Sequence, residues 1–437
     1  MRLTTLLMIL IAGAAFAKTP PPTFTVCASG CDFSMIQDAV NAAVSGTTIT
    51  VGSGRYAENV IINQVSSPKK FILTIGGAGA ASTIVDGNGV SSVFTIVGSK
   101  AIVTVRDMAI RNGLAPGTGA VVPTEGGGVF AGLGASVTID SCIVSGNHAD
   151  HGAGVAAEDS TLTISRSTIS DNTAIGAVYV PEGGGIFFSS TKHRKLLIEH
   201  SIINDNVASY GGGVDIAVEG PRLLTSDATI TGTTISFNNA GIPQGSVPVL
   251  TQGGGIFVGA SKLKITNSTI SNNTSSGPGG ETAALGNHQG EVTLSNVTIA
   301  DNTAVGTTGG VEAGTKTTIS NTIIADNTDA SGESDCAGVL TSKDYNLVLD
   351  AKCTFSGATD HDIIGSDPRL APLADNGGPQ APLTPPETRA PSGALALDSG
   401  NPATPNGKGG HCEPEDETGN ERPVGHCDVG AYQTPPG

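Results

Sequence analysis

Polar and apolar residues alternate along most of the chain, in short stretches that share one pattern. β-Branched and apolar residues occupy every second position, which is typical of β-strands. The clearest copies are VTIDSCIVSGN at 137–147, LTISRSTISDN at 162–172, LLIEHSIINDN at 196–206, ATITGTTISFN at 228–238, LKITNSTISNN at 263–273, VTLSNVTIADN at 292–302 and TTISNTIIADN at 317–327. One unit is too small to bury its own apolar face, so the repeats predict a stack of coils around a shared core.

Each repeat ends at the same kind of residue. These positions are Asn147, Asn172, Asn206, Asn238, Asn273, Asn302 and Asn327. An earlier, degenerate copy at 103–113 ends at Gly113. Asn and Gly tolerate the left-handed region of backbone space at low cost. The column therefore predicts a sharp turn between two strands of each coil, with asparagine side chains placed to hydrogen-bond from coil to coil.

Glycine runs precede the repeats, for example at 126–128, 183–185 and 253–255, and each leads into an apolar strand. Glycine allows one backbone to approach another closely. The residues directly before the runs are Glu125, His151, Glu182, Tyr210 and Gln252. If the coils stack in register, these five form a ladder beside loops of variable length. We interpret the ladder as a candidate glycan-binding stripe; the alternative is that any solvent-facing column of a solenoid is polar.

Together the patterns predict an all-β chain, folded as a single-stranded right-handed parallel β-helix over residues 47–330. Residues 1–17 combine Arg2, a short apolar run and an A-x-A end, as a secretory signal peptide does. Residues 18–46 place apolar side chains at helical spacing after Ser34, the expected N-cap, and predict a helical cap on the open end of the stack. Residues 331–437 have no repeat and more Pro, Gly and Asp, so we expect an irregular C-terminal cap.

The cysteines fall into pairs that are close in sequence. The pairs are Cys27 with Cys31, Cys336 with Cys353, and Cys412 with Cys427. In an exported protein they predict three disulfides that close small loops. Metal binding is the competing interpretation, but no pair has C-x-x-C spacing. Cys142 is left over, and since sibling repeats carry Ser at its position, we expect a buried small residue rather than a nucleophile.

The chain carries 39 acidic and 22 basic residues, a net charge of −17. Such a charge argues against nucleic acid and anionic membranes as partners. One dense basic run, with Lys192, Arg194 and Lys195, could dock an anionic glycan or form an ordinary solvated loop. The chain has no Trp and only 4% aromatic residues, which disfavours a cleft for neutral sugars. The expected partner is an extracellular glycan or surface component.

Two sets of residues resemble known families. Phe33, Ile36, Gln37, the Gly-Arg-Tyr string at 54–56 and Glu58 are similar to the opening of pectin methylesterases and related secreted β-helix proteins. The Asn-Gly-Gly-Pro string at 376–379 and the Cys-Asp-Val-Gly-Ala-Tyr string at 427–432 resemble the bacterial choice-of-anchor Q surface family. The resemblance implies a β-helix that is secreted or held at the cell surface, and it implies no particular chemistry.

Enzymes with this fold need recognisable groups. Calcium-dependent lyases need acidic ligands and an Arg or Lys base, and inverting hydrolases need paired carboxylates. Arg111 and Arg166 are isolated candidate bases, and no motif groups them with acidic residues. We therefore expect a β-helix without catalytic activity, metal or cofactor that presents loops for adhesion or glycan binding. The alternatives are a lyase or hydrolase of an acidic polysaccharide, with calcium in the case of a lyase, and a purely structural envelope component.

Overall fold

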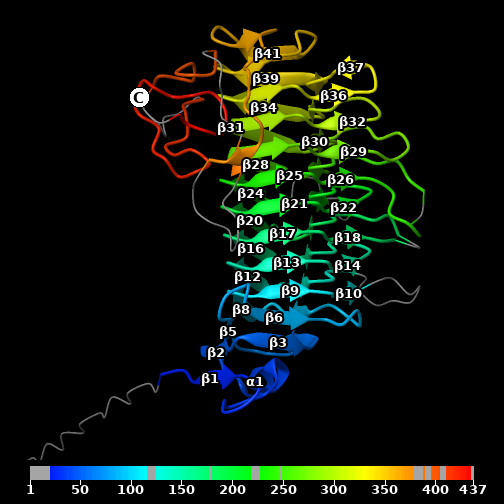
Figure 1. Cartoon of the computed structure of the whole chain (residues 1–437), viewed down its shortest axis with the longest axis vertical. Coiled ribbons are helices and arrows are strands. Elements are labelled where there is room, and N and C mark those ends of the chain that lie inside the picture. Colours follow the sequence, from blue (N-terminus) through cyan, green and yellow to red (C-terminus); the bar gives the residue numbers. More distant parts are fainter. Residues whose placement is uncertain are drawn as a thin grey trace, which may run out of the picture.

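The computed structural model describes residues 20–115, 125–176, 179–217, 227–246, 248–376, 387–388, 395–403 and 410–434. The predicted signal peptide at 1–17 and most of the Asn-Gly-Gly-Pro string lie outside these ranges. The described chain forms an elongated stack of coils that runs along the long axis of the molecule (Figure 1). One helix, α1 (Ile36–Ala42), lies at the end where the stack begins. The remaining described elements are strands, so the prediction of an all-β chain of parallel coils is confirmed.

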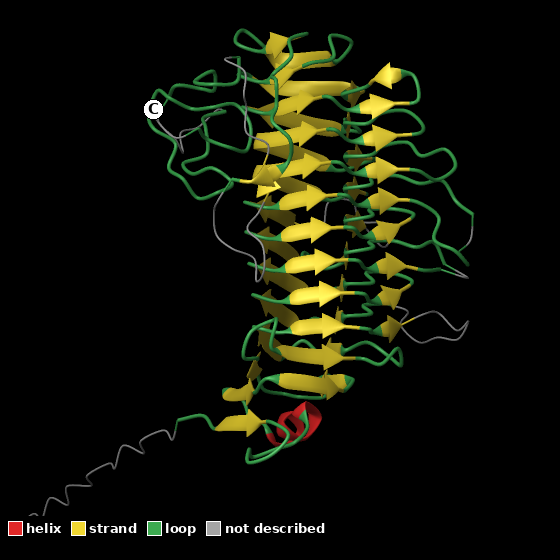
Figure 2. Ribbon diagram, viewed as in Figure 1, coloured by secondary structure: helices red, strands yellow, loops and turns green. Residues whose placement is uncertain are grey.

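Three long sheets run the length of the stack, as the arrows in Figure 2 show. The first sheet contains β1 (Thr23–Val26), β2 (Thr47–Val51), β3 (Gly54–Ala57), β5 (Phe71–Gly76), β6 (Thr83–Asp86), β8 (Ala101–Arg106), β9 (Ala109–Arg111), β12 (Ser136–Asp140), β13 (Ile143–Ser145), β16 (Thr161–Ser165), β17 (Thr168–Ser170), β20 (Lys195–Glu199), β21 (Ile202–Asn204), β24 (Asp227–Thr231), β25 (Thr234–Ser236), β28 (Lys262–Ser271), β31 (Glu291–Ala300), β34 (Lys316–Ser320), β35 (Ile323–Ala325), β39 (Val339–Lys343), β40 (Leu347–Val348), β41 (Thr354–Ala358) and β42 (Ile363–Ile364).

The second and third sheets are narrower. The second contains β4 (Val60–Asn63), β7 (Phe94–Val97), β11 (Val129–Gly132), β15 (Val155–Glu158), β19 (Ile186–Ser189), β23 (Val214–Ala217), β27 (Ile256–Val258), β30 (Leu285–Asn287), β33 (Val311–Glu312) and β38 (Cys336–Ala337). The third contains β10 (Leu114–Ala115), β14 (His148–Ala149), β18 (Thr173–Ala174), β22 (Val207–Ala208), β26 (Asn239–Ala240), β29 (Thr274–Ser275), β32 (Thr303–Ala304), β36 (Thr328–Asp329) and β37 (Gly332–Glu333). A separate hairpin pairs β43 (Ala374–Asp375) with β44 (Glu387–Thr388).

The repeats stack in the register that their alignment predicts. Ile139 pairs with Ile164, Ile164 with Ile198, and Ile198 with Ile230, and all four side chains are fully buried. Equivalent positions therefore form one continuous apolar core through the stack. The parallel pairing also continues past residue 330, because β39 and β41 extend the first sheet within the region expected to be an irregular cap.

The repeat asparagines form a buried hydrogen-bonded column beside this core. The Nδ2 of Asn172 donates to the Oδ1 of Asn206 at 2.9 Å, and the same contact recurs from Asn147 to Asn327. Asn327 donates in turn to Asp335, whose pKa burial raises to about 7. The column accounts for the amide groups that each turn would otherwise leave buried without partners.

The prediction that the asparagines themselves adopt the left-handed conformation is wrong, because the residue before each asparagine adopts it. The left-handed residue of each turn directly precedes the asparagine, for example Asp171 (φ 56°) before Asn172 and Asp205 (φ 55°) before Asn206. Even Phe237 (φ 57°) adopts this conformation before Asn238. The asparagines recur because their side chains bond from coil to coil, not because their own backbone is left-handed.

The glycine runs lie where neighbouring coils come closest. A Cβ atom added to Gly185 would lie 2.6 Å from the carbonyl oxygen of Gly213 on the next coil. That separation is far inside van der Waals contact, so any side chain would force the coils apart. The runs thus hold the strands of the second sheet in register immediately after the ladder residues.

The N-terminal cap contains the expected helix, but Ser34 does not cap it. Met35 is the N-cap residue and makes no side-chain hydrogen bond there. The carboxylate of Glu58 instead accepts hydrogen bonds from the backbone N–H groups of Ile36 (2.8 Å) and Gln37 (2.9 Å). A carboxylate also complements the partial positive charge at a helix N-terminus. The Gly-Arg-Tyr-x-Glu string therefore ties the helix to the first coils.

The C-terminal region folds back against the outer face of the first sheet, beside β28 and β31 (Figure 1). Glu417 is fully buried there and accepts hydrogen bonds from the hydroxyls of Thr234 (3.0 Å) and Thr269 (2.5 Å). Arg422 is also buried and donates to the backbone carbonyls of Asp428 and Gly430. The structure contains the three predicted disulfides, and Cys142 is buried as a free thiol. No helix among the described residues is long and apolar enough to cross a membrane.

Candidate functional site

The structure places the five ladder residues in one column at the edge of the second sheet. Glu125, His151, Glu182, Tyr210 and Gln252 are joined in that order by parallel backbone bridges, one residue per coil. Adjacent members are thus separated by one strand spacing, about 4.8 Å. The ladder exists as a spatial feature, and its residues are partly buried rather than fully exposed.

An aromatic column supports the ladder on the outer face of the second sheet. Phe130, Phe187 and Phe257 alternate with the smaller residues Ala156, Asp215 and Gly286 on successive coils. The ring of His151 packs on Phe187, with centroids 5.0 Å apart, and Tyr210 packs on Phe257 at 5.2 Å. Phe187 is only 1% exposed, so this face is packed almost like an interior.

The ionisable groups of the ladder face are consequently taken out of water. Asp215 is 1% exposed, and burial together with the charge of Glu182 raises the pKa of its carboxyl well above the usual value. Its Oδ1 has no hydrogen-bond partner among the described residues. Burial lowers the pKa of His151, but the neighbouring carboxylates of Glu125 and Glu182 outweigh that effect and raise it. The pKa values of Asp215 and of His151, two coils away, are therefore both raised on this face.

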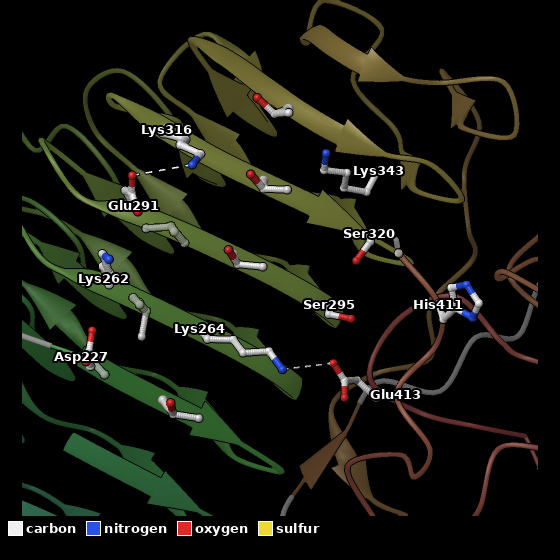
Figure 3. A pocket seen from close by; sticks show the side chains of 18 residues that line it. Asp227, Lys262, Lys264, Glu291, Ser295, Lys316, Ser320, Lys343, His411 and Glu413 are labelled. Atoms are coloured by element: carbon white, nitrogen blue, oxygen red, sulfur yellow. Dashed lines mark hydrogen bonds and ion pairs between the residues drawn. The ribbon is translucent and has the colours of Figure 1, made fainter. Parts of the chain in front are cut away.

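A second candidate site is a groove on the outer face of the first sheet (Figure 3). Its volume is about 700 Å³. Strands β24, β28, β31, β34 and β39 form the floor, and the segment 410–413 of the C-terminal region forms a wall. We call it the lysine groove. Its charged residues are Asp227, Lys262, Lys264, Glu291, Lys316, Lys343 and Glu413, and His411 also lines it.

The sheet register explains how the floor of the groove is built. At the start of each strand, Lys195, Asp227, Lys262, Glu291 and Lys316 pair in succession, so charges of opposite sign alternate from coil to coil. Two residues further along, the neighbours are Thr229, Lys264, Thr293, Thr318 and Thr341. The floor therefore combines ammonium groups with a row of hydroxyls, and Ser295 and Ser320 continue that row.

Two ion pairs organise the groove. The Nζ of Lys316 lies 3.6 Å from the carboxylate of Glu291, and the Nζ of Lys264 lies 3.5 Å from Glu413 in the wall. Figure 3 draws both as dashed lines. The side chains of Lys264 and Lys316 are 54% and 57% exposed, so water screens both pairs. Lys262 and Lys343 also point into the groove, and they take part in no described ion pair.

The wall is fixed by contacts that are distant in sequence. The backbone N–H of Glu413 donates to the Oδ1 of Asn296 at 2.9 Å, and the Nδ2 of Asn321 donates to the carbonyl of Gly410 at 2.7 Å. The disulfide between Cys412 and Cys427 joins this segment to the rest of the C-terminal region. The groove is thus a product of the fold, with a floor and a wall built from separate parts of the chain.

The predicted basic loop lies beside the groove and does not line it. Lys192 forms an ion pair with Asp159 at 2.9 Å, and the Nε of Arg194 has no hydrogen-bond partner among the described residues. Lys195 heads the charged column that leads to Lys262 and Lys316. The other isolated bases are paired as well, Arg166 with Asp140 at 2.6 Å and Arg111 with Asp86 at 3.2 Å.

The described residues contain no group of three or more His, Cys, Asp or Glu side chains that could hold a metal ion. The six paired cysteines form three disulfides. Burial raises the pKa of Cys142 to about 12, so its thiol is not activated as a nucleophile.

Sequence reasoning missed the lysines of the groove. Lys195, Lys262 and Lys316 each stand directly before a repeat, where sibling repeats are preceded by Asp227 and Glu291. Aligning the repeats one residue further toward the N-terminus would have revealed this alternating charged column. The wall residues His411 and Glu413 gave no such signal, because they lie outside the repeats.

Comparisons with known proteins agree with this architecture. A family model described as "Right handed beta helix region" matches residues 29–223. The chain folds as a right-handed parallel β-helix. The crystal structure of pectate lyase Pel9A is similar over 91% of this chain and 90% of its own, with 14% sequence identity and a TM-score of 0.53. At this identity the likeness concerns the fold alone.

Other solved β-helices align less well. A xylose complex of XylC covers 94% of this chain and 98% of its own, at 9% identity and a TM-score of 0.48. The A-module of the mannuronan C-5 epimerase AlgE4 from Azotobacter vinelandii covers 76% of this chain and 94% of its own, at 14% identity and a TM-score of 0.33. A comparison with curated proteins finds no match.

Proposed function

We propose that the protein binds an extended acidic polysaccharide in the lysine groove, outside the cell or at its surface, without performing chemistry on it. The observation that carries the proposal is the gathering of four lysines and a row of hydroxyls in one walled groove. Elsewhere the chain is strongly acidic, with a net charge of −17, so this concentration of cations is a local exception. The three disulfides support the extracellular part of the proposal.

The spacing of the lysines suits a polymer better than a small anion. Lys262 and Lys316 are two coils apart in one column, a separation of about 9.6 Å. A chain of pyranose rings advances per ring by a distance similar to one coil, so carboxylates on alternate rings can meet successive lysines. The threonine and serine hydroxyls between them can donate to or accept from the hydroxyls of the sugar.

The charges in the groove favour binding over catalysis. Its carboxylates lie beside ammonium groups, in pairs that are screened by water, and the half-exposed lysines are open to counter-ions. The carboxyl whose pKa burial raises, that of Asp215, lies on the ladder face and not in the groove. The groove thus holds the cations that would recognise an acidic chain, while the candidate general acid is elsewhere.

The test is binding of polygalacturonate and alginate, measured by isothermal titration calorimetry at low and high sodium chloride, with dextran as the neutral polymer. The triple variant Lys262→Gln, Lys316→Gln, Lys343→Gln should bind about tenfold more weakly or worse, because each lost ammonium removes a charge-assisted contact. The matched control is Lys69→Gln with Lys70→Gln, two exposed lysines at the far end of the stack.

Supporting results are binding that weakens with salt, is lost in the triple variant and persists in the control. Equal binding by the triple variant and the wild type, in samples with the same melting temperature, would reject the groove as the site. Binding of dextran as tight as that of the acidic polymers would reject the electrostatic mechanism.

A specific observation also favours a second function, hydrolysis or elimination on an acidic polysaccharide. Glu182 lies on the coil between those of His151 and Asp215, and a carboxyl whose pKa is raised, as that of Asp215 is, is what a general acid requires. Release of reducing ends and of unsaturated products by the wild type, abolished in Glu182→Gln, would establish this activity. Absence of product from folded protein across the acidic polymers would leave binding as the function.

A further inference from the structure

A separate cavity of about 450 Å³ lies several coils from the lysine groove, near the N-terminal end of the stack. It sits where the first sheet meets the third, so β3, β6 and β14 all contribute to its lining. Arg55, Asp86, Asn112, Leu114 and His148 are the side chains that give it chemical character. Its volume lies within the range of small-molecule sites, and it has no room for a long polymer segment.

The charge of this cavity is set by two arginines that share one carboxylate. The Oδ2 of Asp86 lies 3.0 Å from the guanidinium of Arg55 and 3.2 Å from the Nε of Arg111. It also accepts a hydrogen bond from the Nδ2 of Asn112 at 2.7 Å, while the Oδ1 accepts from the backbone N–H of Asn88 at 3.0 Å. Burial raises the pKa of Asp86, but these donors outweigh burial and lower it. The cluster of two cations and one anion therefore carries a net positive charge.

Arg55 is the arginine that faces the cavity. Its side chain is 57% exposed, whereas that of Asp86 is 0% exposed. A guanidinium has five N–H donors in a rigid fork, and the described contacts of Arg55 use one of its nitrogen atoms. Asp86 therefore holds the group in place and leaves other donors free to meet a ligand. Planar guanidinium groups of this kind bind carboxylates through two parallel hydrogen bonds.

The ring of His148 forms another part of the cavity lining. The Nδ1 of its ring is buried and has no hydrogen-bond partner among the described residues, although buried polar atoms are nearly always paired. The ring lines the same cavity as Arg55, with Leu114 as an apolar neighbour. Because this nitrogen is buried, a ligand in the cavity would pack against the ring of His148 and would not bond to the Nδ1.

We propose that this cavity binds a single acidic sugar, whose carboxylate is held by Arg55 and whose ring packs against His148 and Leu114. The size of the cavity, its net positive charge and its combination of an arginine fork, an imidazole ring and one apolar side chain all fit a monosaccharide that carries one carboxylate. The site is independent of the lysine groove, since the two share no residue.

The experiment titrates galacturonate and glucuronate into the protein by saturation-transfer difference NMR and calorimetry. It uses the background Lys262→Gln, Lys316→Gln, Lys343→Gln, so that binding of monosaccharides in the groove does not contribute. Glucose, which lacks the carboxylate, and acetate, which lacks the hydroxyls, are the control probes. Arg55→Gln tests the carboxylate contact, and His148→Ala tests the packing contact with the imidazole ring.

We expect at least one uronate to bind, glucose and acetate to bind more weakly, and Arg55→Gln to reduce affinity about tenfold or more. His148→Ala should cause a smaller reduction in affinity than Arg55→Gln, because the contact between Arg55 and the carboxylate remains. Arg55 is half exposed, so Arg55→Gln should keep the melting temperature of its parent. No uronate binding, equal affinity for glucose, or undiminished binding by folded Arg55→Gln would each overturn the proposal.

Discussion

The ladder face and the lysine groove share two coils, those that carry Tyr210 and Gln252, yet charged side chains have opposite environments on the two faces. In the groove, Lys264 and Lys316 are more than half exposed and pair loosely with carboxylates across open water. On the ladder face, Asp215 is 1% exposed between aromatic rings and lacks a partner for one oxygen among the described residues. The two shared coils contribute outward-facing residues to both faces, so the repeat itself does not explain the difference.

The difference comes from what surrounds each outward-facing position. Large rings on alternate coils, Phe130, Phe187 and Phe257, cover the smaller residues between them and exclude water. In the groove the equivalent neighbours are threonines, which are short and polar and leave charged side chains in solvent. A solenoid can therefore carry a solvated recognition surface and a desolvated acidic surface on the same coils.

The largest effect expected from this comparison is a loss of stability on the ladder face. Phe187→Ala should lower the free energy of unfolding by about 3–5 kcal/mol, because it removes a ring that is 1% exposed. The matched change in the groove, Thr293→Ala, should alter it by at most about 0.5 kcal/mol. Denaturant unfolding of both variants measures the two changes in the free energy of unfolding. Similar losses for the two would show that the ladder face is not packed as described.

A smaller effect concerns Asp215 and pH. Its pKa is raised in the folded protein, so its contribution to stability is present below the unfolded pKa of about 3.9 and is lost as the pH rises through the folded value. Asp215→Asn removes this loss and should stabilise the protein at pH 8 relative to the wild type, with little difference at pH 4. Melting temperatures at the two pH values measure it, and an equal shift at both would contradict the buried acid.

The smallest effect is expected at the wall of the groove. The pair of Lys264 and Glu413 is exposed to solvent, so its coupling energy in a double-mutant cycle with Lys264→Gln and Glu413→Gln should lie between about 0 and 1 kcal/mol. Unfolding of the two single variants and the double variant gives this energy. A coupling well above that range would mean that the ion pair, rather than Asn296, Asn321 and the disulfide, holds the wall in place.

Much of the fold could be predicted because the contacts are repeated. A coil touches its two neighbours at equivalent positions, so aligning the repeats also aligns Ile164 with Ile198 and Asn172 with Asn206 in space. The ladder forms one column for the same reason, since its residues occupy one position of successive coils. The local disulfides were predictable for a related reason, since partners separated by 4 to 17 residues need only one short loop.

Other features gave no repeated signal. Glu58 caps a helix that begins 22 residues earlier, and Glu417 reaches Thr234 across 183 residues. Lys264 and Glu413 meet across 149 residues to join floor and wall. None of these pairs follows a period, so no pattern in the chain singles out one partner among the many available carboxylates.

The coil, its core, the asparagine column and the residues that share each column can be predicted from the sequence. They depend on local periodicity and on contacts between successive repeats. Which of these columns lines a groove or a buried face follows from the folded chain alone. The lysine groove exists because the C-terminal region returns to cover one side of the first sheet, and the acidity of the ladder face is suppressed because aromatic rings exclude water from it. Burial and long-range contact are collective properties of the folded chain, and they set the charge state and accessibility on which binding depends.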